Sequence, residues 1–260
     1  MKLMNIMEAL DKTCPFSMQE GFDNSGLQVG DTEKDCQKIL LAFDFTEEVL
    51  EEAIAVRADV IITHHPFLFT PLKSISTAHW KGRQIFRLIR ENIALVALHT
   101  NLDKDLQFGV SKALAERLCL QGTQVLLPEE NGCGFGCIGN LSQAMLYTDF
   151  VEFVKQALER PAVKYVGKKN KQVRRIAVSG GSCAEFMEEA QNQGADVFIC
   201  GDLKYHDAQK AQENEMCLID AGHFGTEVWV LKTFQNRLYD IFPTMEIEIC
   251  NKINDYWQYK

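Results

Sequence analysis

The sequence predicts an α/β protein built from two related halves. Apolar, strand-like runs alternate with helical segments along most of its 260 residues, which is the pattern of mainly parallel sheets. One segment occurs twice, because residues 38–65 align without a gap on residues 175–202. Ligand-type side chains follow strand ends in both copies. Open α/β sheets bind ligands at that edge, so we expect a site in the cleft between the halves.

The first half is expected to span residues 1–127. It begins with acidic residues inside an apolar run, Met1–Asp11, which indicates an amphipathic helix rather than a signal peptide. The apolar periodicity then predicts strands at 38–43, 59–63 and 93–98 and helices at 46–57, 79–90 and 109–119.

The second half, 128–260, is expected to begin at the Pro128–Gly132 segment, where proline, glycine and charge interrupt the pattern. A glycine-rich strand region, 133–147, comes first. Strands are then predicted at 173–178, 196–199 and 216–219, with helices at 149–159, 183–193, 204–214 and 224–238. A chain of 260 residues leaves no room for an inserted third domain.

Composition indicates an ordinary soluble chain. With 46% hydrophobic residues it can bury a sizeable core, and no run reaches the ~18 apolar residues of a membrane span. Nine cysteines without a secretory signal indicate reduced thiols and a cytoplasmic protein. A net charge of −9 disfavours nucleic-acid binding. One basic stretch within residues 164–175 fits a solvated edge, or else a collar for a small anion.

Histidines carry most of the functional signal. Of the six in the chain, five follow apolar strand-like runs. Two of them begin the motifs His99–Asp103 and His223–Glu227, each with a carboxylate four residues after the imidazole. A lone histidine beside a core strand is usually structural, but this group supplies enough imidazole and carboxylate for two divalent metals. The five are His64, His65, His99, His206 and His223.

Spacing suggests how these ligands are shared. If His223 caps the following helix, His223 and Glu227 lie on one helix face and can reach one ion. His64 and His65 are neighbours on an extended stretch, where successive side chains diverge, so one histidine to each of two metals is expected. Ions about 3.5–4 Å apart need a bridging group, and Glu227 is the predicted bridge.

Five strings resemble the Nif3-like family of GTP cyclohydrolase 1 type 2 homologues, and they cover nearly the whole chain. They are Phe22–Gly30, Thr63–Phe67 with Pro71–Lys73, His99–Asp103, Gly201–His206 and Asp220–Glu227. The resemblance implies a Nif3-like fold, a ring-shaped homohexamer and a dinuclear site. It places the metal ligands at His64, His65, Asp103, His223 and Glu227, with His99 beside them.

A metal-dependent hydrolase acting on a small molecule, with a nucleotide-like compound as one candidate, is the leading functional hypothesis. Imidazole and carboxylate ligands suit zinc, iron, manganese, nickel or cobalt, and a two-metal site activates water for hydrolysis. Catalytic candidates are Asp202, His206 and His99, although Asp202 and His206 fit a capped helix start equally well. The alternative is a non-catalytic metal-binding or partner-binding regulatory protein.

Overall fold

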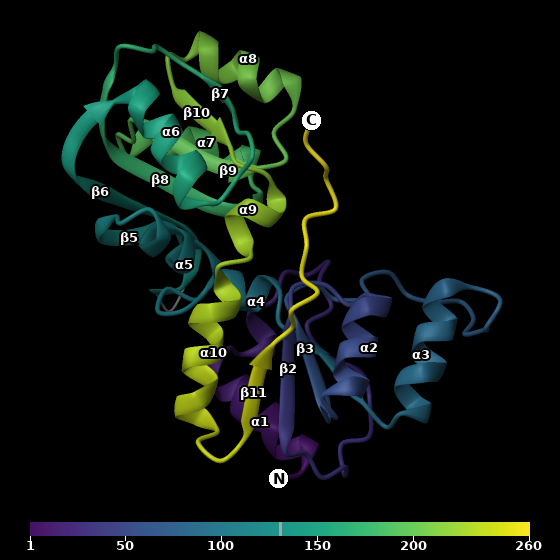
Figure 1. Cartoon of the computed structure of the whole chain (residues 1–260). Coiled ribbons are helices and arrows are strands. Elements are labelled where there is room, and N and C mark those ends of the chain that lie inside the picture. The colour runs from purple at the N-terminus through teal and green to yellow at the C-terminus, as the bar shows by residue number, and fades with distance from the viewer. Residues whose placement is uncertain (130–131) are drawn as a thin grey trace. The chain divides into compact units, whose positions relative to one another are not determined.

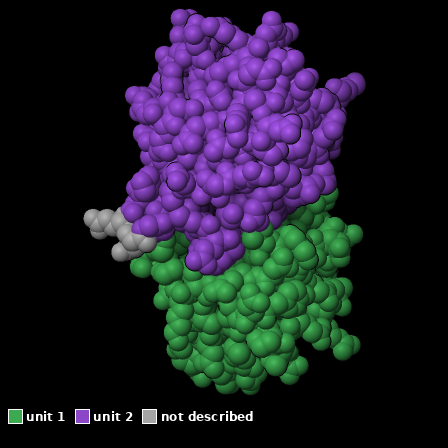
Figure 2. Space-filling model, turned by 90° about the vertical axis from the view of Figure 1, so that its left-hand side faces the viewer, with its two compact units in different colours: residues 1–102, 231–254 green, residues 103–230, 255–260 purple. Residues whose placement is uncertain are grey.

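The computed structural model describes residues 1–129 and 132–260, which form two compact units. Unit 1 consists of Met1–Leu102 and Leu231–Asn254, and unit 2 of Asp103–Val230 and Asp255–Lys260. Figure 2 colours them green and purple. The sequence predicts a junction between residues 127 and 128, whereas in the structure the first boundary between the units lies between Leu102 and Asp103. Pro128 ends a strand that pairs within unit 2, while Glu130 and Asn131 of that junction lie outside the described residues.

Unit 1 contains a five-stranded sheet in the order β1-β4-β3-β2-β11. Strands β2, β3, β4 and β11 run parallel, and β1 pairs antiparallel with β4 at the edge. Helices α4 and α10 each cross a unit boundary. The elements are α1 (Leu3–Thr13), η1 (Phe16–Met18), β1 (Gly26–Val29), β2 (Lys38–Ala42), α2 (Glu47–Ala55), β3 (Val60–Thr63), α3 (Trp80–Arg90), β4 (Ala94–Ala97), α4 (Thr100–Asp103), α10 (Val230–Ile241) and β11 (Glu246–Ile249).

The central strands of unit 1 are apolar throughout because both faces of the sheet are covered. All four residues of β3 and all four of β4 are buried, as expected of parallel strands between helices. Helices α2 and α3 pack on one face, where Leu50 and Leu88 meet Leu40 and Leu95. Figure 1 shows α1 and α10 on the opposite face. This burial fixes the strand ends that carry the histidines.

Unit 2 contains a six-stranded mixed sheet in the order β5-β6-β8-β9-β10-β7. The parallel strands β8, β9 and β10 form its centre, and antiparallel strands flank them. The elements are α5 (Val110–Arg117), β5 (Gln121–Pro128), β6 (Gly134–Leu146), α6 (Tyr147–Ala157), β7 (Lys164–Val166), β8 (Gln172–Ser182), η3 (Ala184–Phe186), α7 (Met187–Asn192), β9 (Val197–Gly201), α8 (Tyr205–Glu213), β10 (Cys217–Asp220) and α9 (His223–Glu227).

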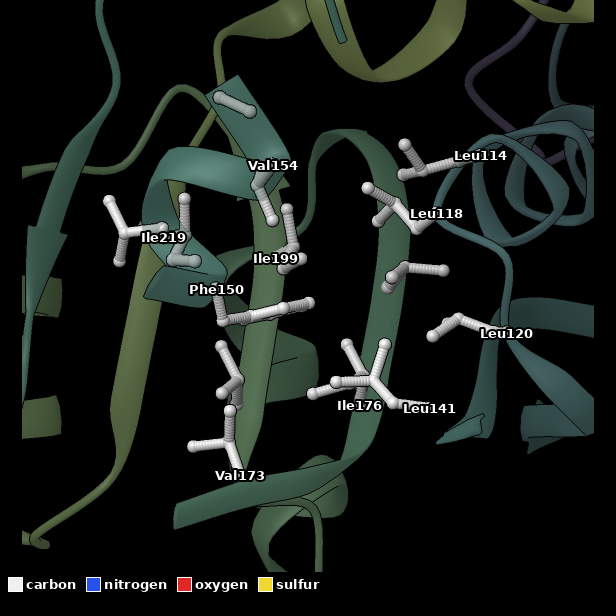
Figure 3. Close-up of a cluster of buried hydrophobic side chains, with 14 of the residues drawn as sticks. Leu114, Leu118, Leu120, Leu141, Phe150, Val154, Val173, Ile176, Ile199 and Ile219 are labelled. Carbon is white, nitrogen blue, oxygen red and sulfur yellow. The ribbon is translucent and has the colours of Figure 1, made fainter. Parts of the chain in front are cut away.

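Both faces of the unit 2 sheet are also covered. On one face, Leu114 of α5 and Phe150 of α6 pack against Ile176 and Ile199 of the central strands, as Figure 3 shows. On the other face, α7 and α8 cover a second cluster that includes Phe198. The central strands are therefore anchored from both sides.

The predicted internal repeat is confirmed. In each unit three parallel strands follow one another with helices between them, β2-β3-β4 in unit 1 and β8-β9-β10 in unit 2. Even the register agrees, because Ile39 pairs with Val60 and Ile176 with Val197, both shifted by 137 residues (176 minus 39).

An aspartate before the middle strand has the same role in both copies. Asp59 accepts hydrogen bonds from the backbone N–H groups of Gln37 and Lys38, at 2.7 and 3.1 Å. Asp196 accepts the equivalent pair in unit 2, both at 2.9 Å. Lys34 and Lys171 lie 3.5 and 3.6 Å from these carboxylates. The repeat therefore extends to the contacts that join strand starts.

Two expected helices differ in the structure. The helix predicted at 224–238 is interrupted, because α9 ends at Glu227 and α10 begins at Val230, one residue before the chain returns to unit 1. The helix predicted at 183–193 is a short 3₁₀ turn followed by α7. Strands β1, β5, β7 and β11 have no counterpart among the predicted elements. Within the described residues, no helix is long and apolar enough to cross a membrane.

Candidate functional site

Three histidines converge at the carboxyl ends of unit 1 strands. His64 and His65 follow Thr63, the last residue of β3, and His99 follows β4 closely. Their ring centroids are 4.8 to 5.4 Å apart. One nitrogen from each ring lies within 4.8 Å of the others, close enough for the three to hold a metal ion. The parallel strands place them together because their carboxyl ends meet at one sheet edge.

The expectation that His64 and His65 diverge is not met. It assumed extended backbone, but β3 ends at Thr63 and the two histidines lie in a bend. Their rings therefore remain neighbours, and Phe43 contacts both at centroid distances of 5.8 and 4.7 Å. His64 is buried, whereas His65 is half-buried.

Each of these imidazoles is oriented through Nδ1. The ring of His64 lies 3.0 Å from the carbonyl oxygen of Leu98, which can only accept, so Nδ1 carries the hydrogen. His65 Nδ1 is 2.9 Å from Asp44 Oδ1, and His99 Nδ1 is 2.7 Å from Asp23 Oδ1. In the neutral tautomer this leaves the lone pair on Nε2. Metal-binding histidines are usually held in this way.

Asp23 anchors His99 from a buried position, with its side chain 0% exposed. Its carboxylate also accepts hydrogen bonds from the backbone N–H and hydroxyl of Thr100. Burial raises the pKa of Asp23, but the hydrogen bonds from His99 and Thr100 and the charge of His99 outweigh it and hold the pKa well below its ordinary value. Asp23 therefore stays ionised.

Unit 2 supplies a fourth imidazole, held between two carboxylates. Nδ1 of His223 is 2.8 Å from Asp202 Oδ2, and Nε2 is 3.0 Å from Glu227 Oε2. The second contact is the expected i, i+4 pair on helix α9. A second proton or a metal ion must supply positive charge between Nε2 and the glutamate. Glu227 is only 5% exposed, so the requirement is strong there.

Two glycines permit this close packing. A Cβ on Gly181, whose φ is +68°, would lie 2.3 Å from Glu227 Oε1, and one on Gly180 would lie 2.2 Å from Val110 Cγ1. The N–H of Gly181 donates to Thr226 Oγ1 at 3.0 Å. The glycine pair near the end of β8 therefore leaves room for side chains of α5 and α9 to pack against the strand.

Asp103 begins unit 2 as the last residue of α4. Burial raises the pKa of the Cys183 thiol, and the nearby carboxylates Asp103 and Glu227 raise it further. The thiol donates to the carbonyl of Gly180 at 3.1 Å. Unit 2 thus places Asp103 and Glu227 near a cysteine whose thiol keeps its proton, so a metal ion held there would meet carboxylate oxygens rather than a thiolate sulfur.

The remaining residues predicted from the sequence also belong to unit 2. His206 is exposed on α8, where its Nδ1 contacts Gln209. Asp202 orients His223, as described above, with a left-handed φ of 56°. In the basic stretch, Lys164 pairs with Asp220, Lys168 with Glu215 and Lys171 with Asp196. These pairs favour the interpretation of this stretch as a charged edge.

Sequence reasoning missed three residues that support the imidazoles. Asp23 lay inside a recognised string but had no assigned role, and Asp44 had no signal at all. Asn101 is fully buried, accepts from the N–H of His99 at 3.1 Å and donates to the carbonyl of Cys14 at 2.8 Å. These contacts are visible only in the folded chain, where segments outside the strands bring a polar side chain next to a histidine.

Comparison with known proteins agrees with this fold. A family model described as Duf34/NIF3 (NGG1p interacting factor 3) matches residues 1–255. A Clostridium perfringens protein named GTP cyclohydrolase 1 type 2 homolog is 37% identical over 89% of this chain and 88% of its own. A Staphylococcus aureus hypothetical protein of known crystal structure has a TM-score of 0.95, at 30% identity over 100% and 99% of the two chains.

A third relative is a Bacillus cereus protein described as related to NIF3. Its crystal structure has a TM-score of 0.93 at 26% identity and covers 100% of this chain and 99% of that one. The family model spans nearly all of the sequence, and the solved structures match it from end to end. The chain therefore belongs to the Duf34/NIF3 family.

Proposed function

We propose that this protein is a metal-dependent hydrolase for a small, nucleotide-like substrate. Two divalent transition-metal ions would be held by His64 and His65 of unit 1 and by Asp103, His223 and Glu227 of unit 2. The observation that carries the proposal is the support of four imidazoles through Nδ1, by Leu98 O, Asp44, Asp23 and Asp202.

A histidine with a purely structural role needs only one hydrogen-bond partner, and that partner can be at either ring nitrogen. Here the rings of His64, His65, His99 and His223 all have an oxygen partner at Nδ1, and three of these four partners are carboxylates. A carboxylate at Nδ1 fixes the tautomer and raises the basicity of Nε2. This arrangement supports Nε2 as the atom with which these histidines would bind a metal.

The donor set is nitrogen and oxygen. It suits zinc, iron, manganese, nickel or cobalt. We assign the bridging role to Glu227, because its buried carboxylate faces His223 Nε2 and lies close to the Gly181 backbone, which limits its rotamers. When bound, such ions lower the pKa of a water and polarise a carbonyl or phosphoryl oxygen.

The remaining polar groups divide into orienting and proton-transfer roles. Asp44 and Asp202 touch only the Nδ1 side of their histidines, so they position ligands. His99 lies beside His64 and His65 with its Nδ1 bound to ionised Asp23. We assign it proton transfer near the ions, because an imidazole paired with a carboxylate readily accepts a proton.

A non-catalytic role is the competing proposal. The matching family is described through an interaction, as NGG1p interacting factor 3, whereas curated relatives carry the name GTP cyclohydrolase 1 type 2 homolog. In this alternative the ions stabilise the fold or a partner complex, and no turnover occurs. We further propose a cytoplasmic, ring-shaped homohexamer that binds neither nucleic acid nor membrane.

Turnover decides between the two classes. The metal-loaded protein is incubated with GTP, phosphoesters and cyclic amides, alongside His65→Ala and the control His79→Ala, which alters an exposed histidine at the start of α3. We expect turnover in the wild type and in His79→Ala but none in His65→Ala. Full metal loading without turnover of any substrate would favour the non-catalytic alternative.

A further inference from the structure

We propose that a pocket in unit 2, between strand β7 and helix α8, binds the ring of an anionic heteroaromatic ligand such as a nucleoside monophosphate. The inference rests on the proposed function, because it assigns the substrate class of the same site. The pocket has a volume of about 240 Å³. Its lining combines an aliphatic floor with two exposed tyrosines, Tyr165 and Tyr205, and two lysines, Lys164 and Lys204.

The floor is aliphatic. Val166 of β7, Leu218 of β10 and Leu203 before α8 line the pocket, together with Ala208. Val166 and Leu218 are register partners on adjacent strands, so the floor is set by the sheet. Ligand pockets usually measure ~300–1,000 Å³. A volume of 240 Å³ is below that range and fits one ring system better than a whole dinucleotide.

Tyr205 supplies a surface for stacking. It is the first residue of α8, it lines the pocket, and it is 82% exposed. A tyrosine ring buries a large area when covered, so leaving this one exposed beside an apolar floor favours a flat partner. Base stacking on an aromatic side chain contributes about 1–3 kcal/mol.

The charges in the lining favour an anion. Lys164 forms a 2.6 Å ion pair with Asp220, whose side chain is 5% exposed, so these two largely neutralise each other. Lys204 lines the pocket as well and leaves an excess positive charge. It stands immediately before α8, whose N-terminus is already capped by Asp207, the acceptor of the Lys204 backbone N–H at 2.8 Å, so the lysine ammonium rather than the helix end would meet the anion. A phosphate or carboxylate on the ring would find its partner there.

Position connects this pocket to the candidate metal ligands. Leu203 follows Asp202, and Asp220 ends β10 three residues before His223. Asp202 and His223 are themselves joined at 2.8 Å. A ring held in the pocket would therefore lie at the strand ends that carry His223. The basic collar considered from the sequence contributes Lys164, while Lys204 comes from outside that stretch.

Binding is tested by calorimetry with guanosine monophosphate, guanosine and ribose 5-phosphate. The full chain is used, with and without metal, as wild type, Tyr205→Ala and Lys204→Ala. Lys210→Ala is the matched control, because Lys210 lies on the same helix, pairs with Glu188 and does not line the pocket. Tyr205 and Lys204 are exposed, so their variants should fold normally.

We expect guanosine monophosphate to bind more tightly than either fragment, even without metal. Tyr205→Ala should weaken it about tenfold, and Lys204→Ala should reduce the preference for the phosphate. No binding to the wild type, or equal affinity in Tyr205→Ala and Lys210→Ala, would overturn the assignment. Binding without turnover retains the pocket and rejects the hydrolase; turnover insensitive to Tyr205→Ala does the reverse.

Discussion

The two copies of the repeat are alike at one end of their strands and unlike at the other. Where the strands begin, Asp59 and Asp196 accept the same pairs of backbone N–H groups, and Lys34 and Lys171 stand at nearly the same distance from them. These contacts join strand starts in both units. In each unit, one aspartate before the middle strand is thereby tied to the backbone near the start of the neighbouring strand.

Where the strands end, the copies differ in chemistry. Unit 1 carries three clustered histidines, whereas the matching positions of unit 2 carry Gly201, Asp202 and one histidine paired with Glu227. One scaffold thus supports two different sets of donors. In both units the shared aspartate lies at the amino ends of the strands and the candidate metal ligands lie at the carboxyl ends, so substitutions can alter one end without replacing side chains of the other.

The largest effect is expected from removing a ligand. Asp103→Ala and Glu227→Ala should each reduce a content of two ions per chain by at least one. A ligand present at about 1,000 times its Kd stabilises by about 4 kcal/mol, so the metal-loaded variants should melt several degrees lower, with smaller changes in the metal-free forms. Elemental analysis and calorimetry measure both.

That experiment is interpretable only if the wild type itself binds the ions. Glu227→Gln removes the charge of the glutamate but keeps its size, so it separates the effect of lost charge from that of lost packing. A wild-type chain that holds less than one ion after reconstitution with zinc, manganese and iron would contradict the assigned ligand set. His79→Ala serves as the histidine control.

Removing the shared aspartates should affect stability alone. Asp59→Ala and Asp196→Ala each remove a charged acceptor from two backbone donors, and such bonds contribute about 1.5–3 kcal/mol. We expect each variant to lose about 2 kcal/mol in urea unfolding of the metal-free protein, with metal content unchanged. Asp35→Ala, at an exposed carboxylate, should cost much less. If the two variants lost very different amounts of unfolding free energy, the two copies of the repeat would share the geometry of this contact but not its contribution to stability.

The acceptors at Nδ1 should act on metal affinity. Partners of this kind usually contribute 10- to 100-fold to affinity, so Asp44→Ala and Asp202→Ala should weaken metal binding by about that factor through His65 and His223. Asp23→Ala should change affinity less than about threefold, because His99 is not assigned as a ligand. Competition with a chelator measures all three. A large loss in Asp23→Ala would make His99 a ligand.

The smallest effect concerns pH. The pKa of Asp23 is lower in the folded protein than in the unfolded chain. Its ionised form therefore stabilises the fold above about pH 4, and this contribution is lost as the pH falls through the folded pKa. Asp23→Asn should be less stable than the wild type at pH 6, and the gap should shrink below pH 4. A constant gap in metal-free urea unfolding would argue against this linkage.

The sequence was sufficient for the buried centre of each sheet. Strands such as β3 and β9 are apolar on both faces and follow clear turns, so pattern alone places them. The edge strands were missed because their signal is weak: β7 has three residues, two of them exposed, and β5 is largely exposed. The interrupted helix after His223 was missed because the apolar pattern continues through Val228 to Val230.

For the site, sequence predicted which side chains gather but not how they are held. Strand ends and i, i+4 spacing account for the neighbouring positions of His64, His65 and His99 and for the His223–Glu227 pair. The acceptor of His65, Asp44, precedes it by 21 residues and that of His99, Asp23, by 76. Such pairs arise from folding, and one sequence gives no signal for them.

Strand β11 has a consequence for the order in which the protein can fold. It pairs in parallel with β2, joining Ile247 to Ile39 across most of the chain. During synthesis more than two hundred residues are added between β2 and β11, so this edge of β2 stays uncovered until the end of the chain is made. An uncovered strand edge is prone to pair with other chains. The residues of unit 2 made meanwhile can complete their own sheet first. A chaperone that protects the nascent chain should therefore bind the earlier segment for longer than the later one.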